Sequence, residues 1–293
     1  AYEIAQCLVG SAMCIRDSVG IFPAYYQNGY AHAITAYMDF PFILPEKKVD
    51  FSKHNISAGM NLLSYGKQVK ASSSLEGHKA TMAADENIKT WWSAASGKQG
   101  EWLQMDLGKS MEIAALQICF ADEGFQTYRH DKLVPVYQYV VEGSADGKNW
   151  QMLADRSLNT KDQIYELVIL DKKMQARFIR IRNTKEFSVG KFSIADMRLF
   201  GRAKGKVPQI VSGFAVERNK DRRRMTFSWD KQPAAEGYVI RWGVSPERID
   251  NAVMVYGNEA EFGFFDRDAS YYLTIEAFNE SGKSKPSKPI KVN

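Results

Sequence analysis

The sequence has few cysteines, no long apolar run and no strong charge of either sign. Its three cysteines, Cys7, Cys14 and Cys119, are spaced neither as a disulfide framework nor as a zinc-type ligand set. No apolar stretch approaches the roughly 18–20 residues of a membrane span. The formal net charge of +5 over 293 residues is mild. The basic residues are scattered apart from Arg222, Arg223 and Arg224 beside Lys220, a cluster that we interpret as a solvated loop, with contact to an acidic partner as the alternative. We therefore expect neither a nucleic-acid partner nor a membrane partner.

Motifs of catalytic sites are also missing from the sequence. It contains no G-x-S-x-G, no H-E-x-x-H and no glycine-rich phosphate loop. Asp39 and Glu46 are carboxylates in an aromatic, proline-rich segment, but isolated acids of this kind are usually solvated or structural. We expect that the chain as it stands is not an enzyme.

The residues that are present favour packed cores built from strands. Hydrophobic residues make up 45% of the chain and charged residues 25%, which is typical of globular proteins. From Gly59 to Arg202, short runs rich in Val, Ile, Tyr and Phe are punctuated by Gly, Asn, Asp and Ser. Several short strands at this spacing predict a β-sandwich or barrel. The fold class expected is all-β.

The composition changes along the chain and divides it into segments. Residues 19–57 are aromatic and proline-rich, and too short to form a core of their own, so we interpret them as the tail of a larger, truncated domain. The stretch GRAKGKVP has the composition of a linker. A second all-β unit follows it, in which residues at period two from Tyr271 to Ala277 share one face. The predicted boundaries are 1–18, 19–57, 58–203, 204–208 and 209–293.

Six stretches of the middle segment carry a family resemblance. They are NLLSYGKQVKASSS, AADENIKTWWSA, GEWLQMDLGK, YVVEGSADGKNW, ARFIRIRN and IADMRLFG. In this order they resemble the coagulation factor 5/8 type C, or discoidin, family, which includes carbohydrate-binding module family 32. The resemblance covers nearly all of residues 58–203. It implies an eight-stranded jelly-roll sandwich with ligand-binding loops at one end.

The last segment resembles a fibronectin type III domain. Trp229, Tyr238, Trp242 and the stretch YYLTIEAFNESGKSKPS carry this resemblance. It implies a second β-sandwich that acts as a spacer, with Tyr271 at the place of a corner tyrosine.

Two further resemblances concern the N-terminal part. The stretch NGYAHAITAYMDFPFILPEKKVDFSKHN is similar to the end of a glycoside hydrolase family 43 catalytic domain. This implies a parent glycosidase that is secreted, periplasmic or at the cell surface of a bacterium, with its catalytic acids upstream. The stretch CLVGSAMCIRDS resembles a translated sequencing adapter, so we expect residues 1–18 to be artefactual read-through.

The segment from Asp85 to Lys109 contains three tryptophans. We expect Trp92 and Trp102 to pack in the sandwich core, because large aromatics usually supply core area. For Trp91 two interpretations stay open: it packs as a structural residue, or it is exposed.

Three loops combine aromatic and polar residues in the way that sugar recognition requires. A sugar ring packs its C–H groups on an aromatic face, and fixed polar groups bond its hydroxyls. The candidate carbohydrate-binding residues are Glu76, His78, Phe125, Tyr128, Arg129, His130, Asn183, Phe187 and Phe192. The alternative is structural: the histidines are ordinary loop residues, Phe192 fills the end of the sandwich, and Arg129 pairs with Asp122 or Asp131.

The discoidin resemblance also implies a structural calcium ion at the turn AADENIKT. Calcium takes six to eight oxygen ligands. The implied ligands are Ala84, Asp85, Asn87, Thr90 and Asp196. The sequence departs from the family pattern at Glu86, where glycine is usual, and at Asp196, where glutamate is frequent. The alternative is a turn held by hydrogen bonds alone.

Together these features predict a non-catalytic carbohydrate-binding and spacer region of a polysaccharide-degrading glycoside hydrolase. Its role would be to hold the catalytic domain near a plant-type or host polysaccharide or oligosaccharide, because tethering raises local concentration. The expected partners are that glycan and the chain's own upstream catalytic domain. The alternative is a structural or adhesive module that packs on the catalytic domain or binds a protein or membrane surface.

Overall fold

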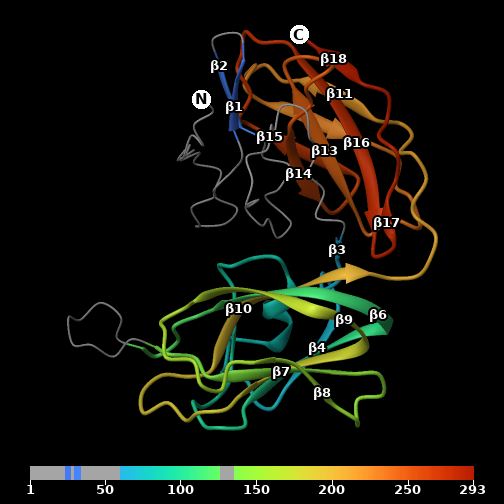
Figure 1. Ribbon diagram of the computed structural model, residues 1–293. Coiled ribbons are helices and arrows are strands. Elements are labelled where there is room, and N and C mark those ends of the chain that lie inside the picture. The colour runs from blue at the N-terminus through green and yellow to red at the C-terminus, as the bar shows by residue number, and fades with distance from the viewer. Residues whose placement is uncertain (1–23, 28–29, 34–59, 126–134) are drawn as a thin grey trace. The chain divides into compact units, whose positions relative to one another are not determined.

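The computed structural model describes residues 24–27, 30–33, 60–125 and 135–293 (Figure 1). Within these ranges Leu62–Lys204 form one compact unit, here called the sandwich unit, and Gly205–Asn293 belong to a second, here called the C-terminal unit. Both are built from strands, as the all-β prediction requires. No helix in the described ranges is long and apolar enough to cross a membrane.

Little of the N-terminal segment is described. A short hairpin pairs β1 (Ala24–Gln27) with β2 (Tyr30–Ala33) in antiparallel register. The predicted read-through at 1–18 and most of the predicted domain tail at 19–57 lie outside the described residues.

The sandwich unit contains eight strands that are hydrogen-bonded into one sheet, and one short 3-10 helix, η2 (Ala80–Ala84). The order along the main path of the sheet is β3-β10-β6-β9-β7-β8, with β4 paired to β6 and β5 paired to β10. The strands are β3 (Asn61–Leu62), β4 (Gln68–Ala71), β5 (Trp92–Ser93), β6 (Trp102–Phe120), β7 (Tyr139–Ser144), β8 (Gln151–Asp155), β9 (Tyr165–Asn183) and β10 (Ser193–Arg202).

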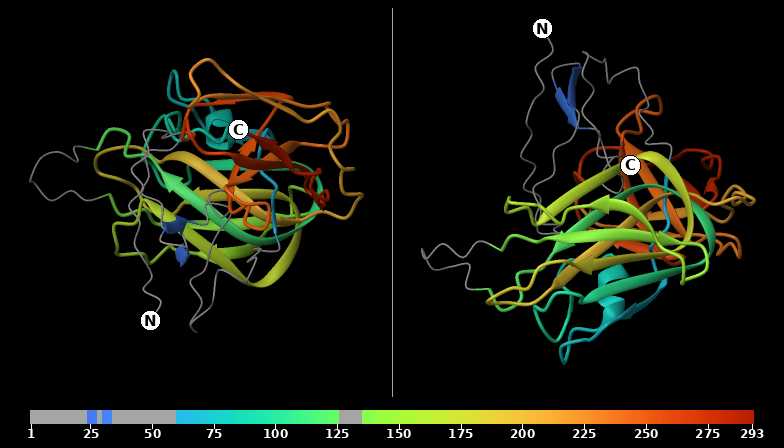
Figure 2. Two further views of the ribbon diagram at one scale, coloured as in Figure 1. Left: turned by 90° about the horizontal axis from the view of Figure 1, so that it is seen from above. Right: turned by 60° about the horizontal axis from the view of Figure 1, so that its bottom comes forward.

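The two longest strands, β6 and β9, belong to both layers of the sandwich. Their pairing is interrupted between Asp106 and Met111 of β6, and an irregularity of this kind bends a strand pair. The first half of β6 pairs with β4 and the second half of β9, whereas its second half pairs with β10 and the first half of β9. The sheet therefore folds over itself, with β7 and β8 in one layer and β10 in the other (Figures 1 and 2).

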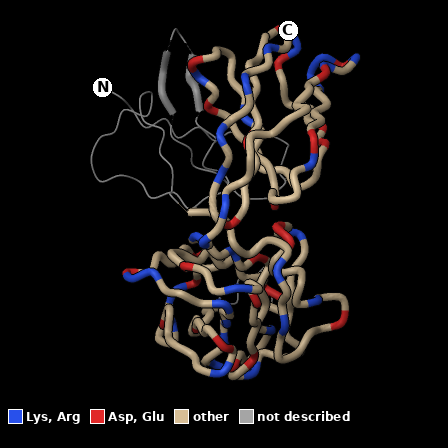
Figure 3. Tube along the Cα trace, turned by 90° about the vertical axis from the view of Figure 1, so that its right-hand side faces the viewer, with Lys and Arg blue, Asp and Glu red and all other residues tan. Residues whose placement is uncertain are grey.

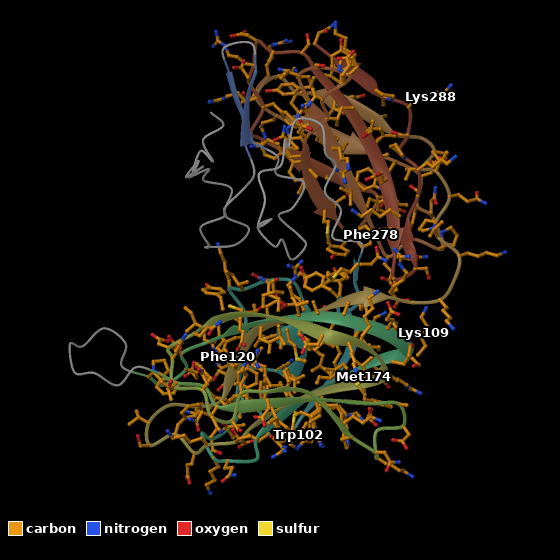
Figure 4. The ribbon with its side chains drawn as sticks, in the orientation of Figure 1. Trp102, Lys109, Phe120, Met174, Phe278 and Lys288 are labelled. Atoms are coloured by element: carbon orange, nitrogen blue, oxygen red, sulfur yellow. The ribbon has the colours of Figure 1, made fainter. Side chains whose placement is uncertain are left out.

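The core of the sandwich unit lies between these layers. Trp92 is 0% exposed and packs edge-on against Phe192, with 6.0 Å between ring centroids. Its indole N–H donates to the carbonyl of Ser73 at 3.0 Å, which satisfies the one polar group of the buried ring. Phe120, which is labelled in Figure 4, stacks on Tyr137 with 4.0 Å between ring centroids. The prediction that Trp92 is a core residue is confirmed.

The same prediction for Trp102 is wrong. Side chains alternate between the two faces of a strand, and in β6 Leu103, Met105 and Leu107 point into the core. Trp102 therefore lies on the outer face, where it is only half-buried.

The C-terminal unit consists of two antiparallel sheets around a second core, which includes Phe227, Trp229, Tyr238 and Phe265. One sheet contains β11 (Ala215–Arg218), β12 (Met225–Ser228) and β15 (Glu259–Phe262). The other contains β13 (Gly237–Gly243), β14 (Asn251–Val255), β16 (Tyr271–Asn279), β17 (Gly282–Lys283) and β18 (Ile290–Val292).

Tyr271 begins β16 and closes a local corner in the C-terminal unit. Its hydroxyl accepts a hydrogen bond from the backbone N–H of Asp266 at 2.9 Å, and its ring packs edge-on against Phe265. A tyrosine bonded to backbone a few residues upstream is a feature of immunoglobulin-like sandwiches. The fibronectin type III assignment itself stays a prediction.

Candidate functional site

Trp91 joins two loops of the sandwich unit that are distant in sequence. Its side chain is half-buried, and its indole N–H donates to Glu123 Oε2 at 3.2 Å. The ring of His78 lies against the indole, with 4.5 Å between centroids and 32° between planes. The His78 loop follows β4 and the Glu123 loop follows β6, so Trp91 brings residues from three parts of the chain together at one place.

Glycines position His78 and Glu123 beside the indole. Gly77 has φ +82° in a turn closed by the hydrogen bond from His78 N–H to the Leu75 carbonyl. Gly124 has φ +75° in the turn that links Phe125 N–H to the Asp122 carbonyl. Positive φ is costly for side chains other than glycine, so each turn depends on its glycine.

The hydrogen bonds of this cluster determine what it offers to a ligand. His78 Nδ1 lies 3.2 Å from the backbone oxygen of Trp91, and because a carbonyl only accepts, Nδ1 must carry the proton. Nε2 of the neutral ring is then an acceptor. Glu123 uses Oε2 for the indole, and within the described residues Oε1 has no hydrogen bond. Glu76 is exposed in the same loop as His78. The cluster therefore combines an aromatic surface with several acceptors for hydroxyl groups.

A carboxylate at the base of the loops holds their ends together. Glu101 accepts hydrogen bonds from the hydroxyls of Ser73 at 2.8 Å and Ser96 at 2.7 Å, and from that of Ser72. Burial by itself raises the pKa of Glu101, but the three hydroxyls and the nearby Lys98 outweigh it and keep the pKa below its ordinary value. The carboxylate is therefore ionised, and it fixes the start of the His78 loop.

A second carboxyl, Asp122, precedes Glu123. Burial raises its pKa, and the repulsion from Asp162 adds to this, while the hydrogen bond from the Tyr137 hydroxyl at 3.2 Å works in the opposite direction. Asp122 is thus held by Tyr137 at the inner end of the loop.

Two predicted ligand residues are wrong because they are buried. Phe192 is 0% exposed and belongs to the core, where it contacts Trp92. Asn183 is also 0% exposed, and its side-chain N–H groups donate to the carbonyls of Gly97 and Lys98 at 3.3 and 2.9 Å. A side chain without exposed surface cannot contact a sugar, so both have structural roles.

Phe125 and Phe187 are half-buried at the edge of the core. Their rings meet edge-on at 5.3 Å, and both pack against Tyr137. They support the Glu123 loop. Tyr128, Arg129 and His130, the remaining predicted ligands, lie outside the described residues.

Sequence reasoning left the role of Trp91 open and did not nominate Glu123. The signal for Trp91 was the neighbouring Trp92: adjacent residues in extended backbone face opposite sides, so a buried Trp92 directs Trp91 away from the core. Glu123 carries no local signal, because only the fold brings it to the indole.

The predicted calcium turn is organised around Asp85. Its Oδ2 lies 2.7 Å from the Thr90 hydroxyl oxygen, which is itself 2.8 Å from the Asn87 carbonyl oxygen. The Asn87 N–H donates to Oδ1 at 3.0 Å. Asp85 Oδ2, the Thr90 hydroxyl oxygen and the Asn87 carbonyl oxygen are of the type that calcium prefers. The Ala84 carbonyl accepts from Gly66 N–H at 3.3 Å, and Asp196 is 3% exposed on β10.

The hydrogen bonds in this turn close it without an ion. In the described part of the chain, no group of three or more His, Cys, Asp or Glu residues is arranged to hold a metal. Calcium binding here stays a prediction.

Glu86 explains how this turn departs from the family pattern. It has φ +58°, a conformation in which glycine is the usual residue. Its carboxylate forms an ion pair with Arg198 of β10 at 3.0 Å, with the two side chains 8% and 3% exposed. Arg198 also donates to Gln117 at 3.0 Å. The glutamate therefore ties the turn to the sheet.

Residues 68–196 match the F5/8 type C domain family. The match includes η2, the turn at Asp85 and the cluster of His78, Trp91 and Glu123, and it excludes the C-terminal unit. No curated protein matches the chain.

Several solved structures are similar to about half of the chain. Chitosan-binding module 1 from a Paenibacillus sp. IK-5 chitosanase/glucanase is 20% identical, with a TM-score of 0.41 and coverage of 48% of this chain and 98% of the module. The family 32 carbohydrate-binding module of Clostridium perfringens NanJ, solved with galactose, is 19% identical, with a TM-score of 0.40 and coverage of 48% and 98%. A Clostridium perfringens family 89 glycoside hydrolase is 26% identical, with a TM-score of 0.40 and coverage of 50% of this chain and 15% of the hydrolase.

Proposed function

We propose that the F5/8 type C unit is a non-catalytic module that binds a carbohydrate at the loops around Trp91. The observation that carries the proposal is the half-buried indole held between the His78 ring at 4.5 Å and the Glu123 carboxylate at 3.2 Å. A fixed aromatic surface beside hydrogen-bonding groups is the combination that sugar sites use.

Each group of the cluster has a defined task in this proposal. The exposed part of the indole packs against the C–H groups of a sugar ring. Glu123 Oε1 and His78 Nε2 accept hydrogen bonds from hydroxyls, and a bond to the ionised carboxylate is the stronger kind. Because Trp91 is already in contact with His78 and hydrogen-bonded to Glu123, binding orders few side chains, which limits its entropic cost.

The wider role follows from the sequence resemblances. The module keeps a polysaccharide-degrading glycoside hydrolase near its substrate by tethering, and the C-terminal unit acts as a fibronectin-type spacer. The parent enzyme, its secretion by a bacterium and the plant or host source of the glycan are parts of this proposal that rest on those resemblances.

A second candidate function is adhesive, and one observation favours it. Tyr165, Leu167 and Ile169 alternate along β9 on the outer face and are 48%, 37% and 42% exposed. Apolar side chains that line up on a surface are typical of contact with another protein.

The test is a glycan-array screen of the full chain, followed by affinity measurements for the best glycan with Trp91→Ala and Trp242→Ala. We expect Trp91→Ala to weaken binding by at least about tenfold, or ~1.4 kcal/mol, because it removes the central aromatic contact. Trp242→Ala is the matched control: it removes an equally large, half-buried indole from the C-terminal unit.

Two outcomes would contradict the proposal. If a folded Trp91→Ala protein binds as tightly as the wild type, the site lies elsewhere. If the folded wild-type chain binds no glycan on the array, the adhesive function replaces the proposed one, and Tyr165, Leu167 and Ile169 become the residues to vary.

A further inference from the structure

The outer face of the layer that contains β7 and β8 carries a second, separate group of aromatic and charged residues. Strand alternation directs Leu103, Met105, Ile179 and Ile181 into the core. The outward positions are then read from the pairing register. Trp102 of β6 lies opposite Arg182 of β9, while Gln104 of β6 lies between Lys70 of β4 and Arg180 of β9. Trp102 is labelled in Figure 4, in the sandwich unit.

The carboxylate of Glu142 interacts with two arginines on this face, Arg180 and Arg182. Arg180 donates through Nε and Nη2 to the same oxygen of Glu142, at 3.0 and 2.9 Å, and its guanidinium lies 4.0 Å from the ring centroid of Trp150. Arg182 reaches the other oxygen of Glu142 only at 3.5 Å. Arg180 is thus fixed by its partners, while Arg182 keeps donors and positive charge that Glu142 does not compensate.

Lys70 is the second cation of this face. It is exposed, and within the described residues it makes no ion pair. The hydrogen bonds from Arg177 and from the Gly108 N–H lower the pKa of the Asp106 carboxyl, and the attraction of Lys70 adds to this. Arg177 binds both oxygens of Asp106 at 2.8 and 2.9 Å.

Asp155, which lies on β8 opposite Val140 of β7, keeps its negative charge, because it accepts from the neutral backbone N–H of Ser157 at 2.9 Å. Figure 3 shows acidic and basic residues interspersed over the unit. Arg177 and Arg180 are each held by two hydrogen bonds to a carboxylate, whereas Lys70 and Arg182 have no such pair of bonds within the described residues.

The spacing of these two cations defines the kind of ligand. Lys70 and Arg182 belong to the strands on either side of β6, so they are separated by two strand spacings, about 10 Å across the sheet. Trp102 and Gln104 lie between them on β6. An elongated chain with anionic groups can contact both cations at once, whereas a small anion reaches one.

We propose that this face is a binding site for a polysaccharide that carries carboxylate or sulfate groups. The chain lies across β6, with a sugar ring on Trp102, a hydroxyl on Gln104, and anionic groups on Arg182 and Lys70. Arg182 offers several N–H donors to a carboxylate or sulfate, and Arg180, held by Glu142 and Trp150, keeps the neighbouring surface rigid. This site is on a sheet face and is independent of the loops around Trp91.

The experiment measures binding of the full 293-residue chain to four probes. Oligogalacturonate carries carboxylates and its methyl ester does not; dextran sulfate carries sulfates and dextran does not. We expect binding to oligogalacturonate, dextran sulfate or both, weakening as salt is raised, because exposed charges are screened. Which charged probe binds distinguishes carboxylate from sulfate recognition.

Charge-matched variants test the residues. Lys70→Gln with Arg182→Gln should weaken binding to the charged probe by at least about tenfold, since two charge-assisted contacts are lost. Lys285→Gln with Lys288→Gln removes the same net charge from exposed positions of the C-terminal unit and should leave binding unchanged. Trp102→Ala should weaken binding, and Trp91→Ala should not. Melting curves show that each variant is folded; Lys70→Gln on its own, at an exposed position, serves if the double variant is not.

Each of the following results overturns the proposal. They are a wild-type chain that binds neither charged probe, an uncharged probe that binds as tightly as its charged counterpart, and a control double variant that loses as much affinity as the Lys70 and Arg182 variant. Loss of polyanion binding in Trp91→Ala would place the site at the loops and overturn it as well. If the chain does not bind polyanions, the effect of Trp91→Ala on binding of a neutral glycan is unchanged. The two proposals are therefore tested independently.

Discussion

Glu86 shows how a single residue can depart from the usual choice for its backbone and still stabilise the fold. Among the described residues it is the one non-glycine with positive φ, at +58°. The left-handed conformation costs roughly 1–2 kcal/mol for a residue with a Cβ. Its buried ion pair with Arg198 joins the turn to β10, and this contact is unavailable to glycine.

Comparing two substitutions at this position separates the backbone cost from the ion pair. Glu86→Ala loses the partner of a buried arginine and keeps the unfavourable φ, so we expect destabilisation of about 3–5 kcal/mol. Glu86→Gly loses the same partner but relieves the backbone, so it should be more stable than Glu86→Ala by about 1 kcal/mol. Urea unfolding of the two variants and the wild type gives both differences.

Two results would show that this account is mistaken. If Glu86→Gly is more stable than the wild type, the ion pair contributes less than the backbone cost. If Glu86→Ala and Glu86→Gly are equally stable, the turn does not hold residue 86 in the left-handed region in solution.

At the scale of elements, the turn between η2 and β5 is the place where a metal would act. Asp85, Asn87 and Thr90 bring three oxygens together within one turn. The same atoms also satisfy one another by hydrogen bonds, so the turn has a folded form without an ion. Calcium binding would therefore stabilise an existing turn.

Calcium is predicted to raise the melting temperature of the sandwich unit. A ligand present at 100 times its dissociation constant stabilises by about 2.7 kcal/mol, so the shift should be measurable after removal of metal with a chelator and titration with calcium. Asp85→Ala should abolish the shift, and Asp221→Ala in the C-terminal unit should not. A melting temperature that responds to neither chelator nor calcium rules out the site.

The strands show how element geometry decides the role of a residue. Trp92 and Trp102 both lie in strands, but Trp92 is 0% exposed, while Trp102 takes an outward position of β6 opposite Arg182. The difference comes from the phase of the alternation, which Leu103, Met105 and Leu107 set by entering the core. Trp102 thereby becomes part of a surface.

At the scale of the whole molecule, the described residues of the two units each include a large hydrophobic core. The core around Trp92 and Phe192 belongs to the sandwich unit, and the core around Phe227 and Trp229 belongs to the C-terminal unit. A compact unit with its own core can unfold cooperatively by itself.

We expect two separable unfolding transitions. Phe192→Ala and Phe227→Ala each remove a ring that is 0% exposed, at a cost of about 3–5 kcal/mol. Each substitution should lower one transition in differential scanning calorimetry and leave the other in place. A single transition lowered by both substitutions would mean that the two units unfold as one.

The sequence by itself determined the fold class, the order of the motifs and the buried position of Trp92. These properties are local: β-branched and aromatic residues at period two predict strands wherever the chain is extended. Residues 68–196, which match the F5/8 type C family, lie within the segment that carried the resemblance.

Only the tertiary structure decided which loop residues meet. Glu123 lies 32 positions from Trp91 and Arg198 lies 112 from Glu86, and no local pattern records such pairs. The sequence predicted Asn183 as a ligand residue because it lies in a loop with aromatic residues. In the structure its side-chain amide donates to the carbonyls of Gly97 and Lys98 instead. The physical reason is that strand patterns follow from neighbouring residues, whereas a binding surface follows from how distant loops pack, and that is settled only when the core closes.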